Sequence, residues 1–491
     1  MARADFSPED ELRDIQGGLI GFNKDHQQFH YLNFADGPTA KQLLAELLPQ
    51  LANGYEVLRF NAAYGENRRH HGDPEALQST WVNLWLTRTG LAVLGAPGLD
   101  LMPEEFRTGM ASRPIGDVGQ SAPDKWVAPF TGGAEPHATV VIAGDNPTDM
   151  EARRAKVFDI LQRHSATVTG TQLGDARPDQ QRGNEHFGFK DGVSQPGIDH
   201  FTKSSKSGSI PPGEVLVGYR DADGNVSGQP LAAQAPVAST YGEVPPPVLN
   251  QPLPSWTHNG TFVVYRRLRQ DVAAFRGSMV NQAPTVALTA DQLGAKLVGR
   301  WPSGAPMERV PGLPKTVDPS AADPSVEHPD VLGDERINKF DFSDDVDGAR
   351  VPRAAHIRKM NPRADKLADG HSSARHRMLR RGIPYGPEFV EGETPYGQVI
   401  PDAQDRGLLF VNYQASISRT FEFVQAHWAN RDDFQQPGDG KDPMISQDTS
   451  DGTFSLPVGR QLTFARWVTT SGGVYAFAPS LAGLADLIQA P

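Results

Sequence analysis

The chain contains no cysteine. A protein without cysteine cannot form disulfides, iron–sulfur clusters, thiolate-ligated heme or a thiol nucleophile. Any transition-metal chemistry must therefore use His, Asp, Glu, Tyr or Met, or a cofactor that brings its own metal ligands. The 14 histidines leave room for such a site.

The chain also lacks long apolar runs and an excess of basic residues. No stretch approaches the roughly 18 consecutive apolar residues of a membrane-spanning helix. The N-terminal residues are acidic where a signal peptide needs a basic region followed by an apolar run. The formal net charge of −12 argues against nucleic acid as a partner, because phosphate binding needs clustered Lys and Arg. We therefore expect a soluble, cytoplasmic protein that binds neither nucleic acid nor a membrane.

The first part of the chain predicts the order β-α-β-β-α-β. Residues 38–52 place five leucines on one helical face, as in a helix that packs on a sheet. A second helix follows the third strand, and Thr148 and Glu151 could form its capping box. The predicted strands are Tyr31–Phe34, Trp81–Leu86, His137–Ala143 and Ala166–Gln172.

The later part of the chain offers a similar series, which ends with a helix from about Ser418 to Trp428 and a strand at Val474–Phe477. We predict an α+β fold of two ferredoxin-like (βαββαβ) halves with antiparallel sheets. The halves comprise residues 1–200 and 259–491, and a Pro/Gly-rich connection, residues 201–258, joins them. A second long irregular stretch, residues 301–349, should border a site or an interface.

Three segments carry candidate chemistry: GFKDGVSQPG from Gly188, AAHIRKMNPR from Ala354 and LRRGIPYGPE from Leu379. Each has an ordinary structural interpretation when taken alone. Asp191-Gly192 is a common turn dipeptide. A histidine in a basic stretch is more often a solvated surface residue than a ligand, and paired arginines often bind surface carboxylates.

Taken together and in this order, the segments resemble the distal-aspartate, proximal-histidine and distal-arginine motifs of the dye-decolorizing peroxidases. DIQGGLIGFNKDHQ, FDFSDDVDGAR and SGGVYAFAPSL also look like that family. The resemblance implies a heme b pocket between the two halves. It further implies a heme peroxidase that reduces hydrogen peroxide and oxidises organic substrates, such as dyes or phenolic compounds, through ferryl intermediates. The alternative is a heme-binding, transfer or sensing protein with little turnover, and a homo-oligomer is possible in either case.

The resemblance makes His356 the axial ligand to the heme iron. The other ring nitrogen of such a ligand donates to a carboxylate or carbonyl, which fixes the tautomer. Glu422 is the expected partner, although its position also suits an exposed helix residue. Arg358 is expected to bind a heme propionate, or else to lie at the surface.

On the peroxide side, the resemblance makes Asp191 the group that moves the proton of peroxide, as base and then as acid. Arg380 should stabilise the developing negative charge. Arg381 is the alternative, because a one-residue shift on an extended segment sends a side chain to the opposite face. Gly188 and Gly192 fit a backbone that approaches a flat macrocycle closely.

Overall fold

The structure is a computed structural model. It describes residues 8–71, 77–203, 205, 207–230, 251–308, 323–327, 329–333, 335–363, 373–390, 399, 401–434, 436–447, 452–456 and 460–491. Nine of its described strands form one sheet with the order β4-β1-β3-β2-β13-β7-β10-β8, in which β9 also pairs with β10, and β5–β6 and β11–β12 form two small sheets of two strands each. The bounds are β1 His26–Asn33, β2 Thr80–Thr87, β3 Ala138–Gly144, β4 Thr167–Asp175, β7 Thr261–Gln270, β8 Leu379–Arg380, β9 Ile383–Tyr385, β10 Gly407–Gln414 and β13 Val468–Ala478.

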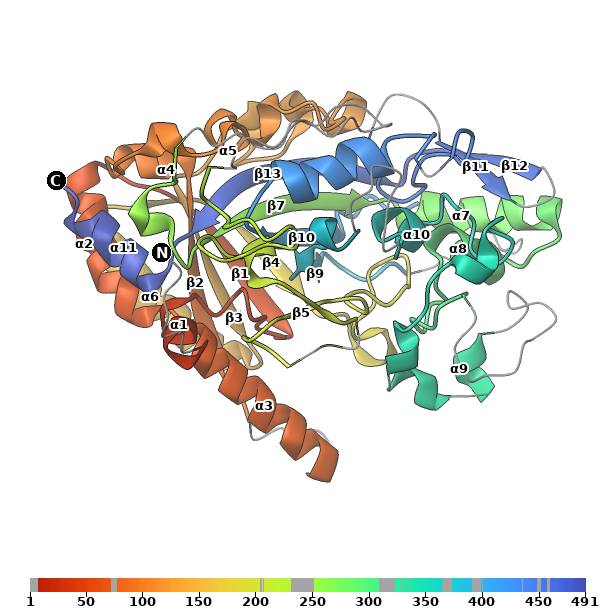
Figure 1. The fold of residues 1–491 in the computed structure, drawn as a ribbon, viewed down its shortest axis with the longest axis horizontal. Coiled ribbons are helices and arrows are strands. Elements are labelled where there is room, and N and C mark those ends of the chain that lie inside the picture. The colour runs from red at the N-terminus through yellow and green to blue at the C-terminus, as the bar shows by residue number, and fades with distance from the viewer. Residues whose placement is uncertain are drawn as a thin grey trace.

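The sheet repeats one strand order twice. In the N-terminal part the order is β4-β1-β3-β2, and in the C-terminal part β13-β7-β10 followed by the short strands β8 and β9 occupies the same places. All of these pairings are antiparallel, and the two parts join where β13 pairs with β2 through Ala476 and Thr87. The predicted α+β fold with two ferredoxin-like halves is confirmed (Figure 1). The residue limits proposed for the halves stay a prediction.

Local sequence explains the first helices. In α2 (Gly37–Leu47), Leu43, Leu44 and Leu47 are buried, as the leucine pattern predicts. The helix α6 (Pro147–Arg163) begins differently from the prediction, because Asn146 is its N-cap and accepts hydrogen bonds from the Thr148 and Asp149 amides. Proline at the first helical position favours this earlier start. The capping box of Thr148 and Glu151 is therefore wrong.

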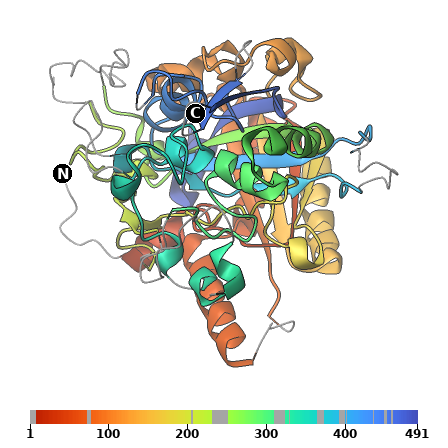
Figure 2. The same cartoon turned by 90° about the vertical axis from the view of Figure 1, so that its right-hand side faces the viewer.

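Helices gather at the two ends of the sheet. Figure 1 shows α2, α6 and α11 at one end, while α3 projects away from the body. At the other end lie α7, α8, α10 and the β11–β12 hairpin, and Figure 2 shows this end facing the viewer. The remaining bounds are α1 Pro8–Asp14, α3 Gly54–His71, α4 Arg88–Val93, α5 Glu104–Thr108, β5 Gly197–Ile198, β6 Ser209–Ile210, α7 Val272–Gln282, α8 Ala290–Val298, α9 Pro324–Glu327, α10 His356–Met360, β11 Gly452–Leu456, β12 Arg460–Phe464 and α11 Leu481–Gln489.

The sheet curls until its edges meet. A Cβ atom placed on Gly174 of β4 would lie 2.5 Å from the side chain of Ile383 in β9, so these edge strands are in close contact. The concave face therefore encloses the interior of a barrel. Side chains that alternate on the strands point into this interior.

The described part of the connection, residues 201–258, is built into the core. Val215, Leu216 and Trp256 are buried, and the Trp256 indole N–H donates to the Pro97 carbonyl at 2.9 Å. This segment therefore packs as part of the fold. Among the helices that the structure describes, none is both long and apolar enough to cross a bilayer.

Candidate active site

A large cavity lies beside the C-terminal part of the sheet. Its empty space, which includes the open mouth, is about 1590 Å³. Strands β7 and β10, helix α10 and two π-helical segments, η15 (Ser418–Glu422) and η16 (Val424–Ala429), form much of its wall. About half of the wall residues are apolar, among them Phe187, Phe189, Leu268, Val298, Met360, Met378, Leu408, Phe410, Phe421, Val424 and Met444.

His356 enters this cavity from the start of α10. Its Nδ1 lies 2.9 Å from Oδ2 of Asp442, whose side chain is fully buried. The other oxygen of Asp442 accepts hydrogen bonds from the Met444 and Ile445 amides at 2.8 and 3.0 Å. The carboxylate is thus fixed in place and holds the imidazole by one nitrogen. Nε2 remains available to a ligand in the cavity.

The prediction that Glu422 is the partner of His356 is wrong. Its carboxylate accepts two hydrogen bonds from Arg113, at 2.7 and 2.9 Å, and one from the Tyr475 hydroxyl at 2.9 Å. Phe421 lines the cavity, whereas Glu422 does not. Helix η15 directs Phe421 into the cavity and the adjacent Glu422 into this separate buried network.

Asp191 and Arg380 form an ion pair on the cavity wall. Oδ1 of Asp191 lies 2.9 Å from Nη1 of Arg380 and accepts from the Gly192 amide at 2.7 Å. The Arg380 amide donates to the Gln195 side chain at 3.0 Å. Burial raises the pKa of Asp191, while the Arg380 charge and the Gly192 hydrogen bond lower it. The lowering effects are together larger, so the pKa lies below its ordinary value of 3.8. The carboxylate is therefore ionised at neutral pH.

Of the residues near this pair in sequence, Arg381 and Gly188 lie outside the cavity wall and Gly192 lies in it. Arg381 turns to the opposite side of the segment, where its guanidinium donates to the Leu19 and Ile20 carbonyls. Gly192 lines the cavity, while Gly188 does not. Both glycines have positive φ, 72° and 103°, which favours residues without a Cβ. Gly188 therefore shapes the turn, and its predicted contact with the macrocycle is not supported.

Three arginines line the cavity: Arg300, which is buried, and Arg363 and Arg377, which are partly buried. Arg300 donates to Ser194 and Asn338 at 2.9 and 2.8 Å, and Arg363 donates to the Asn338 carbonyl. Burial and a neighbouring guanidinium lower the pKa of both to about 9. Within the described residues, none of the three has a carboxylate as an ion-pair partner. Asn338 belongs to the 301–349 stretch, whose described part thus holds two arginines of the cavity wall but does not itself line the cavity.

Arg358 does not serve the cavity. Its guanidinium contacts Asp345 at 3.1 Å and the Val351 carbonyl at 2.7 Å, and the residue is absent from the cavity wall. Residues two positions apart on a helix do not share a face. The prediction that Arg358 binds a propionate beside His356 is therefore wrong.

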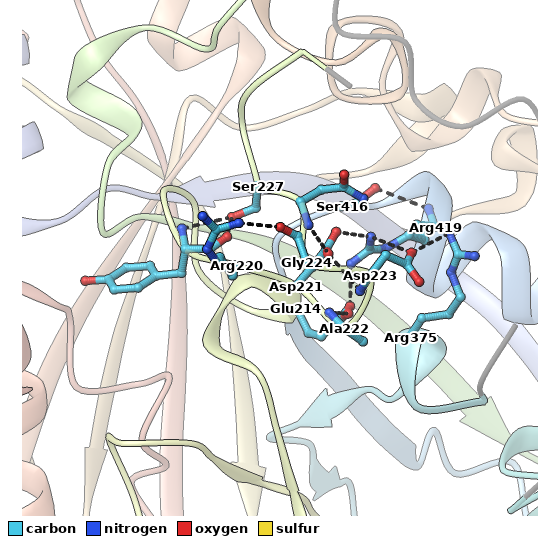
Figure 3. Close-up of polar contacts among 12 residues, drawn as sticks. Glu214, Arg220, Asp221, Ala222, Asp223, Gly224, Ser227, Arg375, Ser416 and Arg419 are labelled. Carbon is cyan, nitrogen blue, oxygen red and sulfur yellow. Dashed lines mark hydrogen bonds and ion pairs between the residues drawn. The ribbon is translucent and has the colours of Figure 1, made fainter. Parts of the chain in front are cut away.

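An ionic network joins the cavity wall to the segment 201–258, which the sequence analysis treats as the connection between the halves. Arg419 in η15 contacts Asp221 at 2.5 Å and Glu214 at 2.6 Å. Arg375, in the turn η14 (Ser373–His376), contacts Asp223 at 3.0 Å. Figure 3 shows both arginines reaching toward the same acidic turn. The network therefore holds in place the segment that leads to β8 and the π-helix that lines the cavity.

These features fit a heme. An imidazole with a buried carboxylate behind it suits an iron ligand, and apolar walls suit a flat porphyrin. The three arginines without carboxylate partners suit the propionates. Asp191 and Arg380 also line the cavity and give it a polar place for a small oxygen ligand.

Comparison with known proteins decides the family. The family model for the DyP dimeric alpha+beta barrel domain matches residues 14–178, and that for the C-terminal part of Dyp-type peroxidases matches residues 215–438. The chain belongs to the dye-decolorizing peroxidase family. It is a heme peroxidase, an oxidoreductase whose cofactor is heme b. The alternative of a heme carrier with little turnover is not favoured.

Relatives resemble this peroxidase along most of their length. Dye-decolorizing peroxidase msp1 of Mycetinis scorodonius is 30% identical over 97% of this chain and 88% of its own. The solved structure of an ancestral D-type dye-decolorizing peroxidase has a TM-score of 0.79 at 30% identity and covers 97% of this chain and 99% of its own. A dye-decolorizing peroxidase in complex with 2,6-dimethoxyphenol has a TM-score of 0.77, also at 30% identity, with 98% and 99% covered.

The sequence analysis assigned no role to Arg300, Arg363 and Arg377 of the cavity wall, nor to Asp442. Asp442 lies 86 positions after His356, in a loop with no periodic pattern. The only local signal is Asp442-Pro443, a dipeptide typical of turns.

Proposed function

We propose that His356 ligates the heme iron, that Asp191 moves the proton of hydrogen peroxide, and that Arg380 stabilises the charge of the bound peroxide. Bound heme b would supply the iron at which peroxide is reduced and would store the oxidising equivalents for the organic substrate. The observation that carries the proposal is the Asp191–Arg380 ion pair on the wall of the cavity that His356 enters.

The lowered pKa of Asp191 suits the first proton step. An ionised carboxylate can take the proton from the peroxide oxygen that approaches the iron site. The protonated Asp191 can then return that proton to the departing oxygen, so that water leaves. Its side chain is 29% exposed, which leaves room for peroxide to reach it.

Arg380 keeps its charge throughout these steps. Its guanidinium is held by Asp191 on one side, and its backbone by Gln195 on the other. A cation fixed in this way stabilises negative charge without reorganising during the reaction. Arg300, Arg363 and Arg377 would hold the heme propionates, and Asp442 would keep the His356 imidazole in one tautomer.

Phenols and anthraquinone dyes are the proposed reducing substrates, because a relative is known in complex with 2,6-dimethoxyphenol. We expect the purified protein to oxidise 2,6-dimethoxyphenol only when peroxide is present. A homo-oligomer and a cytoplasmic location stay predictions, which light scattering and cell fractionation can check.

The decisive test is the Asp191→Asn variant. Asparagine keeps the size of the side chain but cannot accept the proton, so the second-order rate constant with peroxide should fall roughly 10²–10⁴-fold. Stopped-flow absorbance gives the rate constant, and an unchanged Soret band shows that heme is still bound. An unchanged rate constant would remove Asp191 from the proposed mechanism.

A further inference from the structure

A second cavity, named the barrel cavity here, lies inside the curled sheet. Its empty space is about 1140 Å³ including its mouth, where Asn23 and Gly183 are exposed. The strands contribute alternate residues to its wall, as the concave face of a sheet should. These residues are Gln27 and Phe29 of β1, Trp85 of β2, Val141 of β3, and Val411 and Tyr413 of β10.

The barrel cavity meets the heme cavity at the catalytic pair. Asp191, Gly192 and Arg380 line both cavities. A solute in the barrel cavity can therefore reach Asp191 and Arg380 from the side opposite to the heme cavity. Whatever binds there lies next to the groups that receive peroxide.

Positive charge in the barrel cavity is not balanced. Arg381 lines the cavity, and its guanidinium donates only to the carbonyls of Leu19, Ile20 and Arg380. No carboxylate among the described residues forms an ion pair with it. Burial and the neighbouring Arg380 charge lower the pKa of Arg381 to about 10, so it remains a cation at neutral pH. A partly buried cation of this kind favours an anion nearby.

The wall also carries Lys24, which pairs with Asp145, and the amides of Asn23, Gln27, Asn184 and Gln195, which can donate or accept. The Gln195 oxygen is occupied by the Arg380 amide, which leaves the Gln195 NH₂ group as a donor. Tyr413 contributes a hydroxyl and Trp85 an indole N–H to the same wall. Asp191 is the single carboxylate of the described wall, and Arg380 already neutralises it.

We propose that the barrel cavity binds a small monovalent inorganic anion, such as nitrate or a halide, beside Arg381. The donors are single groups from separate side chains, which suits a small anion better than a carboxylate bound by two parallel hydrogen bonds. The bound anion stabilises the fold, because it neutralises Arg381. It also slows the capture of peroxide, because it competes for the Arg380 charge.

The test uses the heme-loaded protein and sodium nitrate, with sodium gluconate at equal ionic strength as the reference. Nitrate should raise the thermal unfolding midpoint in a saturable way, as a ligand of the folded state does. The Soret band should not change, since nitrate does not bind the iron. In Arg381→Gln the nitrate-dependent rise should disappear. The matched control is Arg182→Gln, which removes an exposed arginine that pairs with Asp25, and it should keep the rise.

Tyr413→Phe provides a second variant if Arg381→Gln does not fold. It removes one hydroxyl from the wall and should raise the half-saturating nitrate concentration about tenfold, as for a lost hydrogen bond to a charged group. Crystals soaked in bromide should show an anomalous peak within hydrogen-bond distance of Arg381. Three results would each overturn the proposal: no saturable rise in the unaltered protein, an equal rise in Arg381→Gln, or a Soret shift with nitrate.

Discussion

Each side of the heme cavity carries a carboxylate that is hydrogen-bonded to a nitrogen of a basic side chain, and the N···O distance is 2.9 Å in both pairs. On the proximal side, defined by His356 and Asp442, the Asp442 side chain is 0% exposed and two backbone amides hold it. On the distal side, defined by Asp191 and Arg380, the Asp191 side chain is 29% exposed. A fixed, enclosed carboxylate can orient and polarise its partner, whereas an accessible one can exchange a proton. The same chemical group thus performs two tasks because its surroundings differ.

The largest effect is expected when the proximal ligand is removed. In His356→Gly the heme loses its protein ligand, so the Soret band should be lost on desalting. Added imidazole can occupy the vacated space and should restore the band, as measured by absorption spectroscopy. A variant that retains heme with an unaltered spectrum would show that another residue binds the iron.

Removal of the distal charge should have the next largest effect. Arg380→Leu leaves the negative charge of bound peroxide without its cation, and the rate constant with peroxide should fall about 10²–10³-fold. Heme content should be unchanged. Stopped-flow measurement checks the rate, and a rate within a few-fold of the unaltered protein would assign the role elsewhere.

On the proximal side, Asp442→Asn should cost less than either change. Asparagine can still accept from His356 Nδ1 but carries no charge, so the imidazole becomes a weaker donor to iron. We expect roughly a 10–100-fold loss of activity or heme affinity, with a raised iron reduction potential. Spectroelectrochemistry measures the potential. If the potential does not move, Asp442 positions the ring without tuning its basicity.

The pH dependence of the peroxide reaction reports on the distal carboxylate, Asp191. Since the pKa of Asp191 is lowered, its ion pair with Arg380 is present above the ordinary value of 3.8 and is lost only as pH falls through the lowered pKa. The rate constant with peroxide should therefore be constant near neutral pH and fall in strong acid, about tenfold per pH unit. In Arg380→Leu the burial of Asp191 remains but the cation does not, so the inflection should move to higher pH. An inflection at the same pH in Arg380→Leu would show that the pH profile does not report the Asp191–Arg380 pair.

The smallest effect is expected from Glu422→Gln. Glu422 bonds Arg113 and Tyr475 instead of His356, so the spectrum and peroxide rate should stay within about twofold. Loss of the buried charge should lower the free energy of unfolding by roughly 1–3 kcal/mol. Chemical denaturation followed by circular dichroism checks this value, and Asp442→Asn is the matched comparison because it also neutralises a buried carboxylate.

The sequence predicted what is local and periodic. Strands such as β3 consist of a run of buried β-branched residues, and the leucines of α2 repeat at helical spacing. The motifs that carry Asp191, His356 and Arg380 could also be read, because each is a continuous segment. Helix α3 and the β11–β12 hairpin were not predicted, since α3 lacks a strong apolar stripe.

Contacts between distant segments could not be predicted. Asp442 and His356 are separated by 86 positions, and the Arg113–Glu422 pair by 309. Glu422 lies on a helix near the site motifs, so the sequence alone makes it a reasonable partner for His356. Only the direction of its side chain excludes it. That direction depends on the π-helical turn at Glu422, where one extra residue per hydrogen bond changes which side chains face inward.

The place of β13 in the sheet has a consequence for biosynthesis. Ribosomes make this strand after all the others, yet it lies between β2 and β7, and Val468 lines the heme cavity. Until residues 468–478 leave the ribosome, one edge of β2 and one edge of β7 have no partner strand, and the cavity lacks part of its wall. We therefore expect heme insertion to follow the emergence of residues 468–478 from the ribosome, and the edges of β2 and β7 to need protection until then.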